Sequence, residues 1–151
     1  MTIKRTNGSD PDFAGLVGLS DTFYRQTFGA AMDYYDRFNT IDTIEHALVI
    51  YDEHAAVACG CFRLHDERTV EIKRMYVLPS VRNKGIATVV LAELERWVKE
   101  LGYQTTVLET SKSLIEAVGL YRKNGYKQIE NYGPYAGVET SICMMKDLSA
   151  L

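Results

Sequence analysis

The chain of 151 residues is long enough to bury a core of its own, so we expect one domain over residues 1–151. Hydrophobic residues make up 46% and charged residues 25%, as in ordinary globular proteins, and the net charge of −3 gives no basic surface for a nucleic-acid partner. No apolar run approaches the roughly 20 residues that cross a membrane, and residues 1–13 lack the apolar segment of a secretory signal, so we expect a cytoplasmic protein.

The first half of the chain predicts a strand, two helices and three consecutive strands. The first helix has a polar cap at Ser9 or Asp10 and Pro11 in its first turn. A tight turn at Glu53 and His54 joins two of the strands. In chain order, the predicted segments are a strand over 2–6, helices over 9–29 and 30–38, and strands over 46–52, 55–66 and 69–79.

The second half predicts two more helices and three more strands. Glu95 and Lys99 lie one helical turn apart and predict an ion pair on an exposed helix face. Ser113 and Glu116 have the spacing of a capping box, and Gly125 is a typical helix stop. The segments are a helix over 85–101, a strand over 105–110, a helix over 113–125, and strands over 126–130 and 138–146. This order predicts an α/β (α+β) protein, a mixed sheet with helices on both faces.

The turn that joins the strand over 69–79 to the helix over 85–101 has the features of an anion site. The first N–H groups of a helix have no partners within it, and the helix dipole is positive there. Gly85 brings no Cβ between ligand and backbone, and Arg82 and Lys84 add positive charge. The alternative is an ordinary strand–helix turn with solvated cations. The turn lacks the fingerprints of a P-loop and of a dinucleotide fold.

Two motifs resemble those of a known family. The pattern V-x-P-x-x-R-x-x-G-x-A is similar to the acetyl-CoA motif of the GCN5-related N-acetyltransferase (GNAT) superfamily, and A-V-x-L-Y-x-x-x-G-Y resembles its second signature. The residues that match are Val77, Pro79, Arg82, Gly85, Ala87, Ala117, Val118, Leu120, Tyr121, Gly125 and Tyr126. The resemblance implies a mostly antiparallel sheet of about seven strands, splayed in the middle, and Pro79 is a candidate cause of the splay.

The resemblance also implies that the chain binds acetyl-CoA, and where. The pyrophosphate is expected on backbone N–H groups of one loop, and the pantetheine arm beside the preceding strand. The implied cofactor-binding residues are Met75, Tyr76, Val77, Arg82, Asn83, Lys84, Gly85, Ile86, Ala87, Thr88 and Tyr121. The family often has an asparagine that contacts the pantetheine, and Leu114 stands in its place here.

Acetyl transfer to an amine needs a base, a donor for the developing oxyanion and an acid for the departing thiolate. Tyr121 matches the family's general acid, although a tyrosine packed at the sheet edge is the alternative. The N–H of Tyr76 or Val77 is the expected oxyanion donor. Glu71 is one candidate base, on a predicted face shared with Lys73, Met75 and Val77. Glu109, acting through water, is the other, and Glu71 could instead pair with Lys73.

The acceptor pocket is expected between the early helices and the loop before the final strand. Its candidate substrate-binding residues are Tyr34, Tyr35, Phe38, Tyr132 and Tyr135, with Asp33 and Asp36 nearby. Aromatic and acidic side chains together suit a small cationic amine. The three histidines and three cysteines show no metal-ligand spacing, so we expect no metal site.

We therefore expect an acetyl-CoA-dependent N-acyltransferase that acetylates a primary amine of a small molecule by direct attack in a ternary complex. Two alternatives remain at this point, an enzyme that acetylates proteins or peptides and a non-catalytic module that senses acetyl-CoA. A homodimer is plausible through pairing of the last strands.

Overall fold

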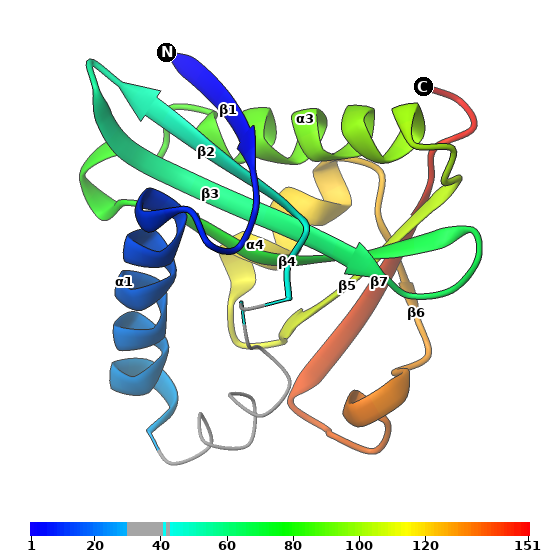
Figure 1. Cartoon of the computed structure of the whole chain (residues 1–151). Coiled ribbons are helices and arrows are strands. Elements are labelled where there is room, and N and C mark those ends of the chain that lie inside the picture. The colour runs from blue at the N-terminus through cyan, green and yellow to red at the C-terminus, as the bar shows by residue number, and fades with distance from the viewer. Residues whose placement is uncertain (30–40, 42) are drawn as a thin grey trace.

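The fold is a seven-stranded sheet with helices on both faces (Figure 1). The computed structural model describes residues 1–29, 41 and 43–151. The helix predicted over 30–38, with Tyr34, Tyr35, Phe38, Asp33 and Asp36, lies outside the described residues. The strands are β1 (Thr2–Thr6), β2 (His46–Asp52), β3 (Ala55–Leu64), β4 (Thr69–Val77), β5 (Thr105–Ser111), β6 (Lys127–Ile129) and β7 (Ser141–Asp147). The helices are α1 (Pro11–Phe28), α3 (Ile86–Glu100) and α4 (Ile115–Lys123), with 3₁₀ turns at Pro79–Val81 and Gly133–Tyr135.

The strand order is β1-β2-β3-β4-β5-β7-β6, and only β4 and β5 are parallel. The predicted mixed, mostly antiparallel sheet is therefore confirmed. On β2, Ala47 and Val49 pack with α1 on one face, while Leu48 and Ile50 pack with α3 on the other. Both faces of the central strands are covered, which explains why β2 reads as a continuous apolar run.

Local signals placed several element boundaries correctly. Asp10 caps α1, and its carboxylate accepts hydrogen bonds from the N–H groups of Asp12 and Phe13. Glu53 and His54 both have positive φ, as a tight hairpin turn requires. No helix among the described residues is long and apolar enough to cross a bilayer.

A β-bulge in β4 changes which side chains share a face. Cys59 pairs with Tyr76 and Cys61 pairs with Lys73, so two residues of β4 stand opposite Gly60. Arg74, at the bulge, has φ of 58°. A Cβ on Gly60 would lie 2.9 Å from the Met75 sulfur and from side-chain atoms of Val90 and Leu94, so glycine lets these side chains pack closely over the bulge.

The bulge reverses the alternation of β4. Before the bulge, the even-numbered residues Val70 and Ile72 pack toward α3. After the bulge, the odd-numbered residues Met75 and Val77 do so. The prediction that Glu71, Lys73, Met75 and Val77 share one face is therefore wrong, because an extra residue shifts the side-chain period by one.

The sheet opens between β4 and β5. These strands pair only from Thr69 to Glu71 on β4 and from Thr105 to Val107 on β5, and diverge beyond that point. The predicted splay is confirmed, but Pro79 is not its cause, since pairing ends eight residues before the proline.

Two predicted helix features are wrong. Glu95 is 3% exposed and binds Lys146 and Tyr126 in the interior, so it forms no surface pair with Lys99. Ser113 is not a cap: its hydroxyl binds that of Ser111, and α4 begins after Leu114 without a side-chain cap. Gly125, with φ of 95°, does follow the end of α4.

Candidate active site

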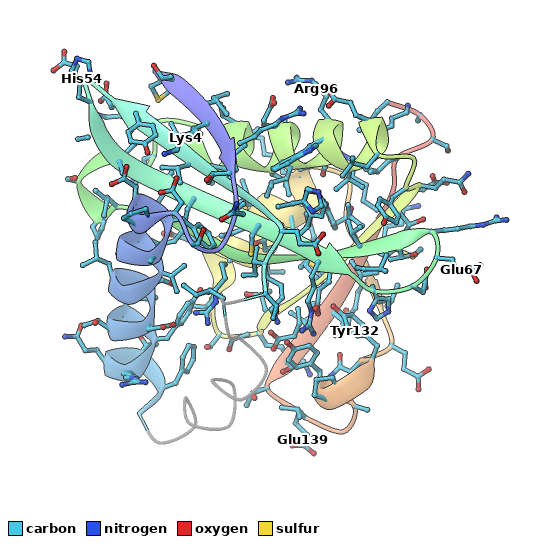
Figure 2. All side chains as sticks on the ribbon, in the orientation of Figure 1. Lys4, His54, Glu67, Arg96, Tyr132 and Glu139 are labelled. Atoms are coloured by element: carbon cyan, nitrogen blue, oxygen red, sulfur yellow. The ribbon has the colours of Figure 1, made fainter. Side chains whose placement is uncertain are left out.

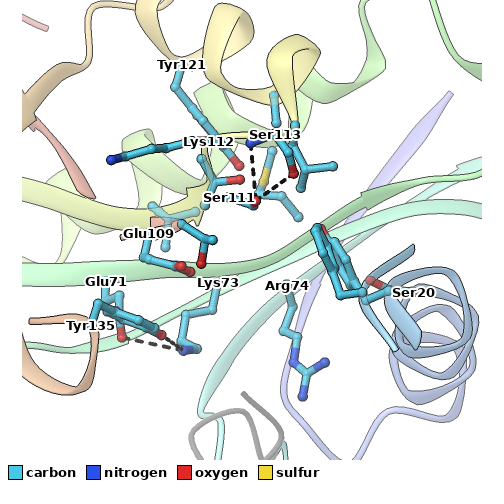
Figure 3. Close-up of a pocket in the computed structure, with 18 of the residues that line it drawn as sticks. Ser20, Glu71, Lys73, Arg74, Glu109, Ser111, Lys112, Ser113, Tyr121 and Tyr135 are labelled. Carbon is cyan, nitrogen blue, oxygen red and sulfur yellow. Dashed lines mark hydrogen bonds and ion pairs between the residues drawn. The ribbon is translucent and has the colours of Figure 1, made fainter. Parts of the chain in front are cut away.

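A pocket of about 610 Å³ lies where β4 and β5 part (Figure 3). Its walls come from α1, β4, β5, α4 and the segment before β7. Five residues that the sequence singled out meet in its lining: Glu71, Met75, Glu109, Tyr121 and Tyr135. Leu114, at the position where the family often has asparagine, also lines it. The opening of the sheet thus creates the space that the candidate chemistry needs.

Tyr121 projects from α4 into the pocket (Figure 3). Its side chain is buried, and its ring packs edge-on against Tyr126 at 5.8 Å between centroids. Burial raises the pKa of the Tyr121 hydroxyl well above its usual range, so the group carries its proton at neutral pH. A protonated phenol fixed in this way can donate to a departing thiolate.

Glu109 is a half-buried carboxyl of the pocket, near the end of β5. Its Oε2 accepts a hydrogen bond of 2.6 Å from the Ser141 hydroxyl. Burial raises the pKa of Glu109 above that of a free glutamate, although the bond from Ser141 and the charge of Lys73 oppose the shift. A carboxyl with a raised pKa is a stronger base once ionised, as proton abstraction from an amine requires.

Glu71 is held by several partners. Its Oε1 accepts a bond of 2.8 Å from Arg63 Nε, and its Oε2 accepts one of 2.6 Å from the Tyr132 hydroxyl. Lys73 Nζ lies 3.8 Å from Oε1, which confirms the alternative of a Glu71–Lys73 ion pair. Tyr132 itself does not line the pocket. It lies in the segment between β6 and β7, which also carries Glu139 (Figure 2).

Lys73 and Arg74 line the pocket but were not predicted to do so. Lys73 Nζ donates to the Tyr135 hydroxyl at 3.2 Å, and burial lowers the pKa of the lysine. Arg74 forms an ion pair of 2.5 Å with Asp21 of α1. The sequence signal that could have revealed the bulge is Gly60, a glycine inside β3, the strand that pairs with β4.

One face of α1 also reaches the pocket. Ser20, Tyr24 and Phe28 lie four residues apart and all line it. Tyr24 and Phe28 are both partly exposed. The polar Ser20, four residues before Tyr24, is the sequence sign that this helix face borders a cavity.

The predicted phosphate loop has the backbone geometry of an anion site. Asn83 and Gly85 have positive φ of 64° and 77°, and the first turn of α3 has no side-chain cap. Space is open for 4 Å around a Cβ built on Gly85. Arg82 donates from Nε to the Val77 carbonyl at 2.9 Å, which fixes the loop to the end of β4. The loop, which also includes Lys84, Ile86, Ala87 and Thr88, lies outside the lining of the pocket.

The edge of β4 between loop and pocket can accept an extended ligand. Leu78 donates its N–H to Val57 of β3, and N–H groups alternate along a strand, so the N–H of Val77 points to the open edge. The N–H of Tyr76 then points to β3, and its side chain packs with α1. Phosphate loop, open edge and pocket follow one another, and the residues present therefore fit acetyl-CoA.

Cys59 and Cys61 belong to the apolar core rather than to the pocket. They are buried together in the cluster under α1, and burial raises the pKa of Cys61 to about 12. Within the part of the chain that the structure describes, no three His, Cys, Asp or Glu side chains are placed to hold a metal ion.

Comparisons with known proteins agree with this geometry. The family model described as Acetyltransferase (GNAT) family matches residues 13–126. A protein of Azospirillum brasilense described as an IAA acetyltransferase is 31% identical over 150 residues, or 98% of each chain. An uncharacterized N-acetyltransferase of Schizosaccharomyces pombe is 36% identical over 88 residues, covering 56% of this chain and 53% of the relative. The chain thus spans about half the length of that relative, and 39% of a probable N-acetyltransferase from Xenopus tropicalis.

Solved structures lead to the same family. The crystal structure of an acyl-CoA N-acyltransferase from Klebsiella pneumoniae has a TM-score of 0.81 at 29% identity and covers 97% of both chains. A GNAT family acetyltransferase from Elizabethkingia anophelis with acetyl-CoA bound has a TM-score of 0.71 at 21% identity, over 97% of both chains, and shows the shared fold. The chain therefore belongs to the acetyltransferase (GNAT) family.

Proposed function

We propose that the protein acetylates a primary amine of a small molecule by direct attack within a ternary complex. The observation that carries the proposal is the continuity of the pocket, which Tyr121 and Met75 line on the cosubstrate side and Glu109 and Tyr135 line on the other. A volume of about 610 Å³ suits a small-molecule ligand, because such pockets usually measure about 300–1,000 Å³.

Each end of the cosubstrate has candidate partners in the chain. The loop from Arg82 to Thr88 would bind the pyrophosphate through its N–H groups, and the open edge at Met75–Val77 would align the pantetheine arm. The direction of the Val77 N–H supports it, rather than that of Tyr76, as the donor for the carbonyl oxygen. Bound acetyl-CoA supplies the activated acetyl group.

The proton transfers are assigned to Glu109 and Tyr121. The neutral amine nitrogen forms a bond to the acetyl carbon, and Glu109 accepts one proton from that nitrogen, directly or through one water, as the carbon–sulfur bond breaks. Tyr121 donates its hydroxyl proton to the departing thiolate. Glu109 is preferred to Glu71 because both oxygens of Glu71 already accept bonds from Arg63 and Tyr132.

Replacing Tyr121 with phenylalanine is expected to lower kcat about 100-fold, because loss of a general acid typically reduces a rate by about 10²–10⁴ and a thiolate needs less help than most leaving groups. Stopped-flow detection of the released thiol measures the effect. Tyr103→Phe, in a half-buried tyrosine outside the pocket, is the control and should keep the wild-type rate. Equal rates for wild type and Tyr121→Phe would remove the acid role.

Glu109 should give the pH profile of kcat/KM a limb that rises with pH. Since burial raises the pKa of Glu109, the base form appears only above the usual glutamate range, and the midpoint should exceed 4.5. Glu109→Gln should lower the plateau about 100-fold and remove this limb, leaving only the titration of the amine. Glu139→Gln changes an exposed carboxylate of the same pocket and should keep the limb.

The overall proposal is tested by thiol release with acetyl-CoA and a panel of primary amines, each product being identified by mass spectrometry. Turnover above thioester hydrolysis for at least one small amine is the expected result. Acetylation of peptides but of none of the amines would instead indicate a protein acetyltransferase.

A further inference from the structure

Two neighbouring cationic residues, Lys73 and Arg74, border the acceptor side of the pocket. Consecutive residues of a regular strand point to opposite faces, but the bulge allows both to line the same cavity. Figure 3 shows both side chains extending from β4 in the same general direction. Each side chain is only 10% exposed, so neither charge is solvated as a surface charge would be.

The charge of Lys73 is incompletely balanced by the described residues around it. Among them, Lys73 pairs with Glu71 at 3.8 Å, beyond hydrogen-bond range, and that carboxylate accepts a closer bond from Arg63 at 2.8 Å. One buried carboxylate therefore faces two cations. Arg74 has its own partner in Asp21, at 2.5 Å.

Glu109, a half-buried carboxyl of the same pocket, accepts its hydrogen bond of 2.6 Å from Ser141, and among the described residues it forms no ion pair with Lys73. Burial raises the pKa of Glu109 and lowers the pKa of Lys73, and both directions show that the pocket disfavours charges without close partners. Lys73 donates to the Tyr135 hydroxyl at 3.2 Å, which leaves further donor capacity on the ammonium.

We propose that the acceptor is a small amino acid in the chemical sense, a primary amine that also bears a carboxylate, and that Lys73 Nζ and the Tyr135 hydroxyl bind this carboxylate beside Arg74. The inference rests on the proposed function and adds the substrate class. The carboxylate would complete the coordination of Lys73, while the amine would lie toward Glu109 and Tyr121 across the same pocket. An acceptor held at both ends presents its nitrogen in one orientation.

Matched acceptors test the proposal on the unmodified protein. For several amino-carboxylic acids, kcat/KM is compared with that of the corresponding carboxamide and of the amine without the carboxyl group. One charge-assisted contact predicts a preference of about 10- to 100-fold for the acid. Equal values for the acid, the amide and the plain amine would overturn the proposal.

The role of Lys73 is tested by Lys73→Met, which keeps a long unbranched side chain and removes its charge. This variant should lose about 10- to 100-fold in kcat/KM for acids, mainly through KM, and change less than about threefold for carboxamides. Lys73→Arg should recover part of the loss. Lys112→Met removes an exposed cation from the same pocket and is the matched control. Equal losses for acids and carboxamides in Lys73→Met would assign the lysine a structural role and overturn the contact.

Binding measurements separate this inference from the proposed function. The same acids and carboxamides are titrated calorimetrically into protein loaded with CoA. Preferential binding of acids, lost in Lys73→Met, supports the carboxylate site even if no acceptor is turned over, in which case only the catalytic proposal fails. Turnover of plain amines without any binding preference for acids overturns the carboxylate site and leaves the catalytic proposal intact.

Discussion

Replacing Gly85 with glutamate should weaken acetyl-CoA binding about a thousandfold, since two or three charge-assisted hydrogen bonds from backbone N–H groups would be lost. Gly85 is the N-cap residue of α3, with φ of 77° and open space where a Cβ would stand. A carboxylate there would lie on the positive end of the helix dipole and occupy the place of the pyrophosphate. Isothermal titration calorimetry with acetyl-CoA measures the loss.

Gly102 provides a matched control at the other end of the same helix. It also has positive φ, 94°, and open space around a Cβ, so Gly102→Glu imposes similar backbone strain. A carboxylate near the C-terminus of α3 opposes the dipole, so Gly102→Glu should be the less stable variant and yet bind acetyl-CoA normally. Gly85→Gln, of the same size without the charge, should show an intermediate loss. Unchanged affinity in Gly85→Glu would show that the pyrophosphate binds elsewhere.

Much of the fold followed from local rules. The cap at Asp10, the turn at Glu53 and His54 and the stop at Gly125 each depend on a residue and its nearest neighbours in the chain. The strand over 46–52 was predicted with its observed ends because its apolar run is bounded by polar residues. The error at Glu95 arose because a distant residue binds it. Lys99 lies one helical turn after Glu95 in the sequence, but Lys146, from β7, binds Glu95 in the interior.

The candidate site shows the same division. Tyr121, Glu109 and Gly85 stand in motifs whose spacing is visible in the sequence. Lys73 was predicted only as an ion-pair partner of Glu71, and Arg74 was missed because the bulge opposite Gly60 breaks the alternation of side chains along β4. The cytoplasmic localisation, the single domain and the homodimer stay predictions. The contacts within one copy of this fold do not determine them.

The second large effect is expected for Lys146→Met, which should lower the free energy of unfolding by about 3–5 kcal/mol, the usual cost of leaving one partner of a buried ion pair alone. Glu95 has a side chain that is 5% exposed, and its Oε1 accepts a bond of 2.8 Å from Lys146 Nζ. Its Oε2 accepts a bond of 2.9 Å from the Tyr126 hydroxyl, which also lies 2.7 Å from the hydroxyl of Thr106. Without Lys146, the neutral phenol of Tyr126 would be the partner left to the carboxylate among the residues that the structure describes. Urea unfolding with an unchanged m-value measures the loss.

The control is Arg96→Met, on α3, the helix that carries Glu95. Arg96 is 64% exposed, points outward from α3 (Figure 2) and pairs with Glu93 three residues away, so its removal should cost less than about 1 kcal/mol. The double variant Glu95→Leu, Lys146→Met removes both charges together and should recover most of the stability, because an apolar pair in a buried site has no desolvation cost. A loss below 1 kcal/mol in Lys146→Met would contradict the burial of the pair. Tyr126 also packs edge-on against Tyr121. The buried group of Glu95, Lys146 and Tyr126 therefore helps to hold the ring of the proposed general acid in place.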